Sequence, residues 1–164
     1  LFNVVWIAMG TAVSIIVGQH LGAGEFDKAE ESCWRILVFS VLSAAGMGLL
    51  MAACSTLFPA MYNTTQEVRS LATGLLLVVA AAGPLHAFCH ASYFTLRSGG
   101  KTWVTFLFDS AYLWVISIPV ARLLSTGTAW HIILVYGICQ FIDIVKCIIG
   151  YILLKRKVWI NRIV

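Results

Sequence analysis

The chain has 164 residues, of which 60% are hydrophobic and only 11% are charged, and its mean hydropathy is +0.92. These values lie outside the usual range of soluble domains and are typical of an integral membrane protein. The net charge of +4 is small and the cations lie mainly in loops, so no nucleic-acid partner is indicated and the lipid bilayer is the expected surroundings.

Five apolar segments are long enough to cross a hydrocarbon core of about 30 Å, which needs roughly 20 residues. They cover roughly residues 1–18, 34–57, 68–95, 103–122 and 130–154, and a short tail, 155–164, follows. The connections are short, so neighbouring helices should be antiparallel and residues 1–164 should form one all-α membrane bundle. The chain starts without Met and without a signal-peptide pattern, which predicts that it begins inside a longer protein.

The link between the first two spans begins with GQHLGAGE, residues 18–25, and continues with a segment of mixed charged and apolar residues, 26–35. The glycines should permit a close turn. The spacing of apolar residues in 26–35 predicts a short amphipathic helix at the membrane interface before the second span. Its charged side chains are interpreted as a solvated face.

The third span contains Pro84 near its middle, which predicts a kink because proline cannot donate to the carbonyl four residues earlier. His86 and His90 share a face beyond it, and Tyr93 follows. Two histidines lack a third ligand, so the sequence predicts no metal site and favours a polar packing face. The turn after this span should end the helix, with Arg97 facing the negative helix end and Gly99-Gly100 supplying a positive φ.

The five cysteines show no CxxC or metal-type spacing, and no cofactor is indicated. We interpret them as small buried hydrophobic side chains. They are Cys33, Cys54, Cys89, Cys139 and Cys147.

Asp109 lies about two turns into the fourth span, where a carboxylate costs about 2.5–3.5 kcal/mol on insertion scales. No basic residue lies one helical turn away, so the obvious partner within the helix is missing. Two interpretations remain open. Asp109 serves coupling or cation recognition, or it makes a structural hydrogen bond to Tyr93, Tyr112 or a carbonyl freed at Pro84.

The fifth span carries Asp143 and Lys146, three residues apart. This spacing predicts that the two side chains pair with each other on one helix face. A structural role is favoured for that pair.

The distribution of cations predicts the orientation of the bundle. The loops after the first and third spans and the C-terminal tail hold Lys28, Arg35, Arg97, Lys101, Lys155, Arg156, Lys157 and Arg162. The opposite side holds only Arg69 and Arg122. The positive-inside rule therefore places the first set, with the C-terminus, in the cytoplasm.

Two motifs at these inner turns resemble those of the multidrug and toxic compound extrusion (MATE) transporters. The pattern Gly-Gln-x-Leu-Gly-Ala-Gly followed by an alanine is met by Gly18, Gln19, Leu21, Gly22, Ala23, Gly24 and Ala29. The pattern Leu-Arg-x-Gly-Gly-x-Thr, with Asp, Trp and Pro in the next helix, is met by Leu96, Arg97, Gly99, Gly100, Thr102, Asp109, Trp114 and Pro119. Nearly the whole chain takes part in the resemblance.

The resemblance implies twelve helices in two six-helix lobes, of which this chain looks like the last five. The N-terminal lobe would then be a missing partner. It also implies a multi-pass protein of the plasma membrane, in a bacterial inner membrane, that exports cationic amphiphilic drugs in exchange for inward Na⁺ or H⁺. Candidate coupling residues are Asp109, His86, His90, Tyr93 and Tyr112. The sequence departs from the family at Lys101, where many relatives are acidic, and at Leu85-His86 after Pro84, where some members carry a carboxylate that helps bind the cation, so the coupling ion stays open.

Two other functions are compatible with a helical membrane bundle. A lipid-linked oligosaccharide flippase should line its cavity with several cations to hold a pyrophosphate, whereas only Lys146 is placed to lie within the membrane. An enzyme that modifies lipids would need clustered Asp, His or Ser at the interface, and the sequence shows no such cluster. Efflux by antiport is therefore the preferred hypothesis.

Overall fold

The computed structural model describes residues 3–100, 102–127 and 131–160, and every element in this part of the chain is a helix. The first three spans are α1 (Asn3–Gly22), α2 (Phe26–Ala53) with the one-turn α3 (Leu57–Ala60), and α4 (Gln66–Ser98). The fourth span is built from α5 (Thr102–Phe106), the π-helical η1 (Leu107–Ala111) and η2 (Leu113–Ser117), and α6 (Ile118–Gly127). The fifth consists of α7 (Ile132–Phe141) and α8 (Asp143–Lys155).

Five helical runs in the described residues are long and apolar enough to cross a membrane. Many large apolar side chains face outward from them, among them Leu42, Leu49, Trp114, Val115 and Leu134. A soluble domain rarely exposes so much apolar surface, whereas lipid contact accounts for it. The prediction of an all-α helical membrane bundle is confirmed.

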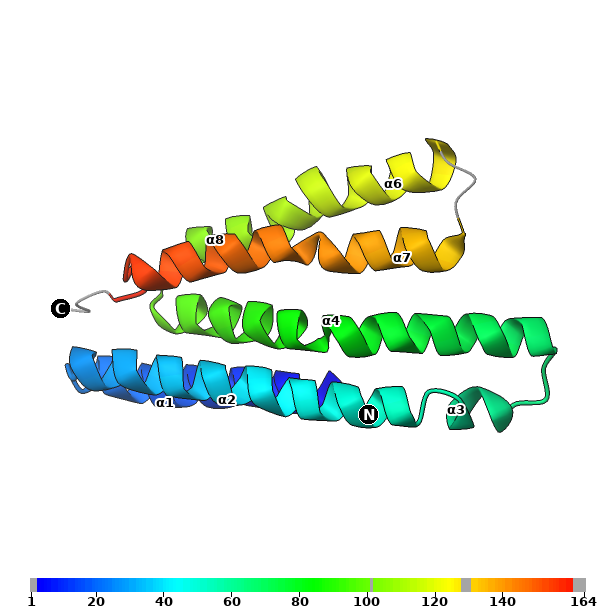
Figure 1. Cartoon of the computed structure of the whole chain (residues 1–164). Helices are drawn as coiled ribbons and strands as arrows, with labels where there is room; N and C mark the ends of the chain where they lie inside the picture. The colour runs from blue at the N-terminus through cyan, green and yellow to red at the C-terminus, as the bar shows by residue number, and fades with distance from the viewer. Residues whose placement is uncertain (1–2, 101, 128–130, 161–164) are drawn as a thin grey trace.

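α4 is the central helix of the bundle, because it packs against α1 and α2 on one side and against α7 and α8 on the other (Figure 1). The turns after α1 and α4 lie at the same end as the C-terminal residues of the described chain. An ion pair of 2.6 Å between Lys157 Nζ and Glu30 Oε2 joins that end to α2, and Glu30 raises the pKa of Lys157. The turns after α1 and α4 and the C-terminal segment, which contain most of the predicted inner cations, share this end, while Lys101 and Arg162 lie outside the described residues.

α2 begins at Phe26, so the prediction of a separate interfacial helix over residues 26–35 is wrong. Its buried positions recur every three or four residues without interruption, at Ala29, Cys33, Leu37, Ser40 and Ala44. Because this spacing is continuous and no proline or glycine stands between Phe26 and Ala44, the charged segment forms the first turns of the spanning helix. Its charges are also partly paired, since Arg35 Nη2 lies 2.5 Å from Glu31 Oε1.

The glycine-rich link is shorter than predicted, because α1 continues to Gly22 and therefore includes Gly18 and Gln19. Only Gly24, with φ of 74°, adopts the left-handed conformation of a turn. Glu25, beside it, lies 2.8 Å from the ammonium of Lys28, and this hydrogen bond lowers the pKa of Glu25.

The turn after α4 uses its two glycines for different purposes. Gly100 has φ of 76°, as predicted, whereas Gly99 has φ of −75°. A Cβ at Gly99 would collide with the carbonyl oxygen of Trp159. Trp159 is buried in the main core with Leu96, so a close backbone approach at Gly99 lets the C-terminal segment seal this end of the bundle. Arg97 lies in the last turn of α4, as predicted.

The carbonyl of Ala80 loses its usual helical donor because Pro84 has no N–H, although α4 runs through this residue as one helix. Gly48 of α2 packs directly on that carbonyl: a Cβ on Gly48 would lie 2.6 Å from Ala80 O. The backbone of α2 therefore covers a polar group that would otherwise face lipid. The kink predicted at Pro84 stays a prediction.

Gly48→Ala should destabilise the bundle, because the added methyl must separate α2 from α4 at a tightly packed crossing. Overpacking of this kind costs about 1–3 kcal/mol. Gly46→Ala is the matched control, since an added Cβ there meets no atom within 4 Å. We expect a lower midpoint of thermal unfolding in detergent for Gly48→Ala alone, and equal midpoints for the two variants would contradict the close contact.

Candidate functional site

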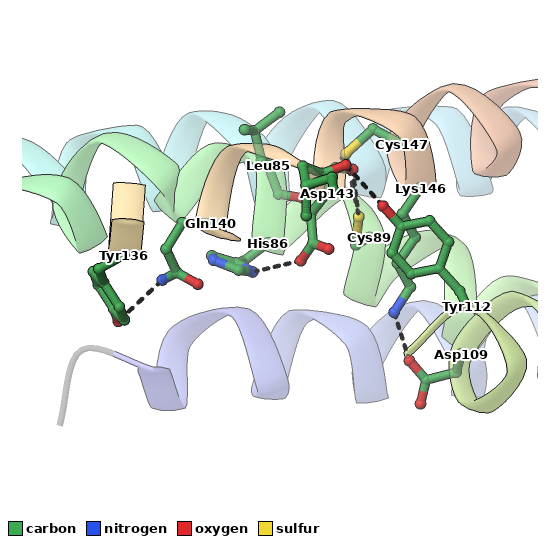
Figure 2. A network of polar contacts seen from close by, with 11 residues as sticks. Leu85, His86, Cys89, Asp109, Tyr112, Tyr136, Gln140, Asp143, Lys146 and Cys147 are labelled. Atoms are coloured by element: carbon green, nitrogen blue, oxygen red, sulfur yellow. Dashed lines mark hydrogen bonds and ion pairs between the residues drawn. The ribbon is translucent and has the colours of Figure 1, made fainter. Parts of the chain in front are cut away.

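A polar pocket of about 320 Å³ lies between α4, η1 and α8. Figure 2 shows several of its side chains pointing toward one another from these elements. The pocket is lined by His86, Cys89, His90, Tyr93, Phe94, Asp109, Asp143 and Lys146. The α4 members recur at intervals of three and four residues, which places them on one face of that helix. The structure thus brings together His86, His90, Tyr93 and Asp109, which were predicted from separate spans.

Asp109 forms an ion pair with Lys146, with 2.5 Å between Asp109 Oδ1 and Lys146 Nζ. The lysine side chain is only 15% exposed, whereas that of Asp109 is 53% exposed. The ammonium also lies 5.3 Å from the ring centre of Phe108 and 5.9 Å from that of Tyr112. Aromatic faces attract a cation at such distances. The ammonium of Lys146 is therefore fixed by the carboxylate and the two rings, whereas about half of the Asp109 side chain remains exposed.

The predicted pairing of Asp143 with Lys146 is wrong, because each side chain contacts a different helix. His86 Nδ1 lies 3.8 Å from Asp143 Oδ2, and both side chains are about one quarter exposed. This distance is too long for a hydrogen bond, so the contact is a loose ion pair when His86 is protonated. The indole of Trp6 from α1 stacks on the imidazole at 6.4 Å between ring centres.

The sequence showed no basic partner for Asp109 within its own helix, and the structure supplies Lys146 from another helix, α8. Asp109 lies in the π-helical η1, where the wider helical turn changes the direction of side chains and often marks a functional site. The second π-helical segment, η2, ends two residues before Pro119. Pro119 cannot donate a helical hydrogen bond, which is one cause of such irregular turns.

Tyr112 anchors η1 to the junction between α7 and α8. Its hydroxyl donates to the carbonyl oxygen of Ile142 at 2.7 Å. Asp143 is the next residue, so this bond holds the start of α8 against the fourth span. Tyr112 lines a second cavity of about 350 Å³, which shares Asp109, Asp143 and Lys146 with the first pocket. The sequence-derived candidate Tyr112 therefore lies beside the polar pocket, in the adjoining cavity.

The pocket lining contains one more carboxyl group than amino group. Two carboxylates, Asp109 and Asp143, face one ammonium, Lys146, and the two histidines add no charge while they are neutral. In an environment of low dielectric constant, one net negative charge strongly favours the entry of one monovalent cation. In the described residues no group of three or more His, Cys, Asp or Glu side chains is placed to hold a metal ion.

Four residues of the pocket were not predicted as site residues from the sequence. Asp143 and Lys146 were interpreted as a structural pair, and neither Phe94 nor Cys89 was proposed as a pocket residue. The sequence did contain an indication for Asp143 and Lys146, because they are the only two charged residues between Ile132 and Leu154 in the fifth span. Since charges within the membrane are costly, they mark polar cavities in the same way as Asp109 does. Cys89 lies about one helical turn after His86 and therefore on the same face of the helix as the two histidines, so the spacing also indicated Cys89.

The family to which the chain belongs follows from comparison with known proteins. The family model described as MatE matches residues 1–123, which is well over half of the chain. The chain belongs to the MATE family. The resemblance drawn from the two glycine motifs is thereby confirmed, and MATE family members are transporters rather than enzymes.

Several relatives match over most of this chain. Human "Multidrug and toxin extrusion protein 1" is 24% identical over 145 residues, which cover 87% of this chain and 25% of the human protein. Two Bacillus subtilis proteins, "Uncharacterized transporter YisQ" and "Probable multidrug resistance protein YoeA", are 22% and 26% identical, over 95% and 83% of this chain. The chain spans between a quarter and about a third of the length of these relatives. No solved structure matches it.

Proposed function

We propose that this chain is part of the C-terminal lobe of a multidrug efflux antiporter and supplies a cation-binding pocket to it. The exported substrates would be cationic amphiphilic drugs, and Na⁺ or H⁺ would enter in exchange. The coupling ion, the substrate class and the role of each pocket residue belong to this proposal. The relatives' names support extrusion of drugs and toxins, and the MATE family match supports transport.

The observation that carries the proposal is that two carboxyl groups and one amino group line the pocket between α4, η1 and α8, which leaves one net negative charge when the histidines are neutral. One monovalent cation neutralises it, and either a coupling ion or the charged group of a drug meets that requirement. Because the two would compete for the same charge, binding of one favours release of the other. Competition of this kind for intramembrane carboxylates is the basis of exchange when two lobes rock about a central site.

Asp109 is the carboxylate best placed for this exchange. It is half exposed, so a cation can reach it, while Lys146 remains in place to neutralise it when the cation leaves. His86 and Asp143 lie on the neighbouring turns of α4 and α8 and provide a second site for a proton. His90 and Tyr93 supply polar groups on the same wall of the pocket.

A lipid-linked oligosaccharide flippase is disfavoured by the same charges. Recognition of a pyrophosphate needs several uncompensated cations. Lys146 is the one lysine or arginine that lines this pocket in the described part of the chain, and Asp109 already neutralises it.

The proposed location is the plasma membrane, as in a bacterial inner membrane, with the C-terminus in the cytoplasm. The support is the concentration of cations at the end of the bundle that carries the turns after α1 and α4 (Figure 1). The missing N-terminal lobe would form the other wall of the substrate cleft.

The proposal is tested by transport measurements on the full-length transporter that contains this chain. The purified transporter in liposomes should move a cationic dye when an inward gradient of Na⁺ or of H⁺ is imposed. The response to each gradient, applied separately, identifies the coupling ion. Asp27→Asn is a matched control, because it removes an exposed carboxylate outside the pocket and should leave transport unchanged. Failure of both gradients to move any dye would refute the proposed function.

A further inference from the structure

Two cysteines from different helices meet beside the polar pocket. Cys89 Sγ of α4 and Cys147 Sγ of α8 are 3.2 Å apart, although the residues are 58 positions apart in the sequence. Cys147 Sγ also lies 3.5 Å from the carbonyl oxygen of Leu85, as Figure 2 allows the reader to follow. The interpretation of the cysteines as small buried hydrophobic side chains did not include this contact between two thiols.

The two thiols face different surroundings. Cys89 lines the polar pocket with His86 and Asp109, although only 6% of the residue is exposed, so the pocket is the route by which a small water-soluble molecule would approach its sulfur. Cys147 lines an apolar groove of about 380 Å³ between α2, α4 and α8, whose other walls include Val41 and Phe88. One thiol thus borders the polar pocket, and the other borders the apolar groove.

We propose that Cys89 and Cys147 form a reversible disulfide site that links α4 to α8, with a small water-soluble disulfide as the oxidant. A protein disulfide requires about 2.05 Å between the sulfur atoms, so closure needs an approach on the order of 1 Å. Movements of this size fall within ordinary side-chain motion.

The chemistry proceeds by two exchange steps. The Cys89 thiolate attacks one sulfur of the reagent R–S–S–R. A mixed disulfide forms between Cys89 Sγ and this sulfur, and the S–S bond of the reagent breaks. The released R–S⁻ takes up the proton that Cys89 lost. The Cys147 thiolate then attacks Cys89 Sγ, forms the Cys89–Cys147 bond and expels the second R–S⁻, which takes up the proton from Cys147. Two protein thiols are oxidised and one R–S–S–R is reduced to two R–SH. An excess of thiol reverses both steps.

The link would act on the pocket through α8. Asp143 and Lys146 lie within one turn of Cys147, and they hold the contacts to His86 and Asp109. A covalent bond between α4 and α8 at this level fixes Asp143 and Lys146 relative to the histidines, and it constrains Asp109 only through the ion pair of Asp109 with Lys146. This regulatory consequence rests on the proposed function, because it assumes that exchange at Asp109 needs movement of α8, whereas formation of the disulfide does not depend on it.

The disulfide is tested by peptide mapping of the full-length transporter in membranes. The protein is treated with bis(hydroxyethyl) disulfide, free thiols are blocked with N-ethylmaleimide, and the digest is analysed by mass spectrometry. A peptide pair joined through Cys89 and Cys147 should appear, and dithiothreitol should remove it. Cys54→Ala, at the far end of α2, should keep the linked pair. A stable mixed disulfide on Cys89 without the linked pair, or no reaction at either cysteine, would overturn the proposal.

The regulatory consequence is tested by transport in the same preparation. Dye efflux should fall at least fivefold after oxidation and return after dithiothreitol. Cys147→Ala should keep basal efflux and lose the response to the oxidant. A linked pair with unchanged efflux would refute regulation of the pocket. If the untreated transporter moves no dye, the proposed function fails, and peptide mapping still decides whether the disulfide forms.

Discussion

Asp109→Asn should abolish efflux driven by an ion gradient and should also lower the stability of the protein. Asn keeps the size of Asp109 but cannot carry the charge that a coupling cation neutralises. It also leaves the ammonium of Lys146, which is 15% exposed, without its carboxylate. Loss of one partner of a buried ion pair costs about 3–5 kcal/mol. The 53% exposure of Asp109 places the expected cost at or below the lower end of that range. Thermal unfolding and dye transport measure the two effects separately.

The double variant Asp109→Asn/Lys146→Met separates the structural role of the pair from its role in transport. Met fills a volume similar to that of the lysine stem and removes the unpaired ammonium. Thermal stability should therefore recover toward that of the parent, because neither charge is left alone. Efflux should stay below a tenth of the parent value, since no carboxylate remains at position 109 to exchange cations. Recovery of efflux together with stability would show that the pair is purely structural.

The sequence was sufficient for the helices because membrane spans depend on local composition. A run of about 20 apolar residues is read directly from the chain, and the antiparallel order follows from short connections. Errors occurred where a helix boundary depends on contacts from elsewhere. For example, the backbone of Trp159 lies so close to position 99 that only glycine fits there, and no local sequence pattern reveals this contact. The charged start of α2 was assigned to a separate helix because charged side chains are costly inside a membrane, although its apolar stripe continues without a break from Ala29 into the span.

The pocket was predictable only in part, because its residues come from three spans. Each predicted candidate was recognised because a polar side chain is costly in lipid. This cost depends on the single residue and on its depth in the membrane, and it does not identify the partner of that residue. Pairing depends on which helix faces are adjacent, and the sequence gives no rule for this in a bundle. Asp109 with Lys146 and Cys89 with Cys147 are both contacts between distant spans. Spacing within one span therefore suggested Asp143 as the partner of Lys146, which is wrong, and it suggested no partner for Cys89 or Cys147.

Asp143→Asn should weaken the binding of cationic dyes by at least tenfold while leaving the fold close to that of the parent. The pocket would then hold Asp109 and Lys146 alone and would carry no net charge. A unit charge about 6 Å away contributes roughly 3 kcal/mol at an effective dielectric constant of 20, which exceeds the 1.4 kcal/mol that corresponds to tenfold in affinity.

The cost in stability should be small for Asp143→Asn, unlike that for Asp109→Asn. His86 lies 3.8 Å from Asp143, beyond hydrogen-bonding distance, and it is also held by stacking on Trp6. Dye binding is measured by fluorescence anisotropy, and thermal unfolding is followed in parallel. Asp143→Glu is the matched variant, because it keeps the charge and should retain most of the affinity. Unchanged dye affinity in Asp143→Asn would show that the net charge of the pocket does not select cations, and Asp143 would then serve only to orient His86.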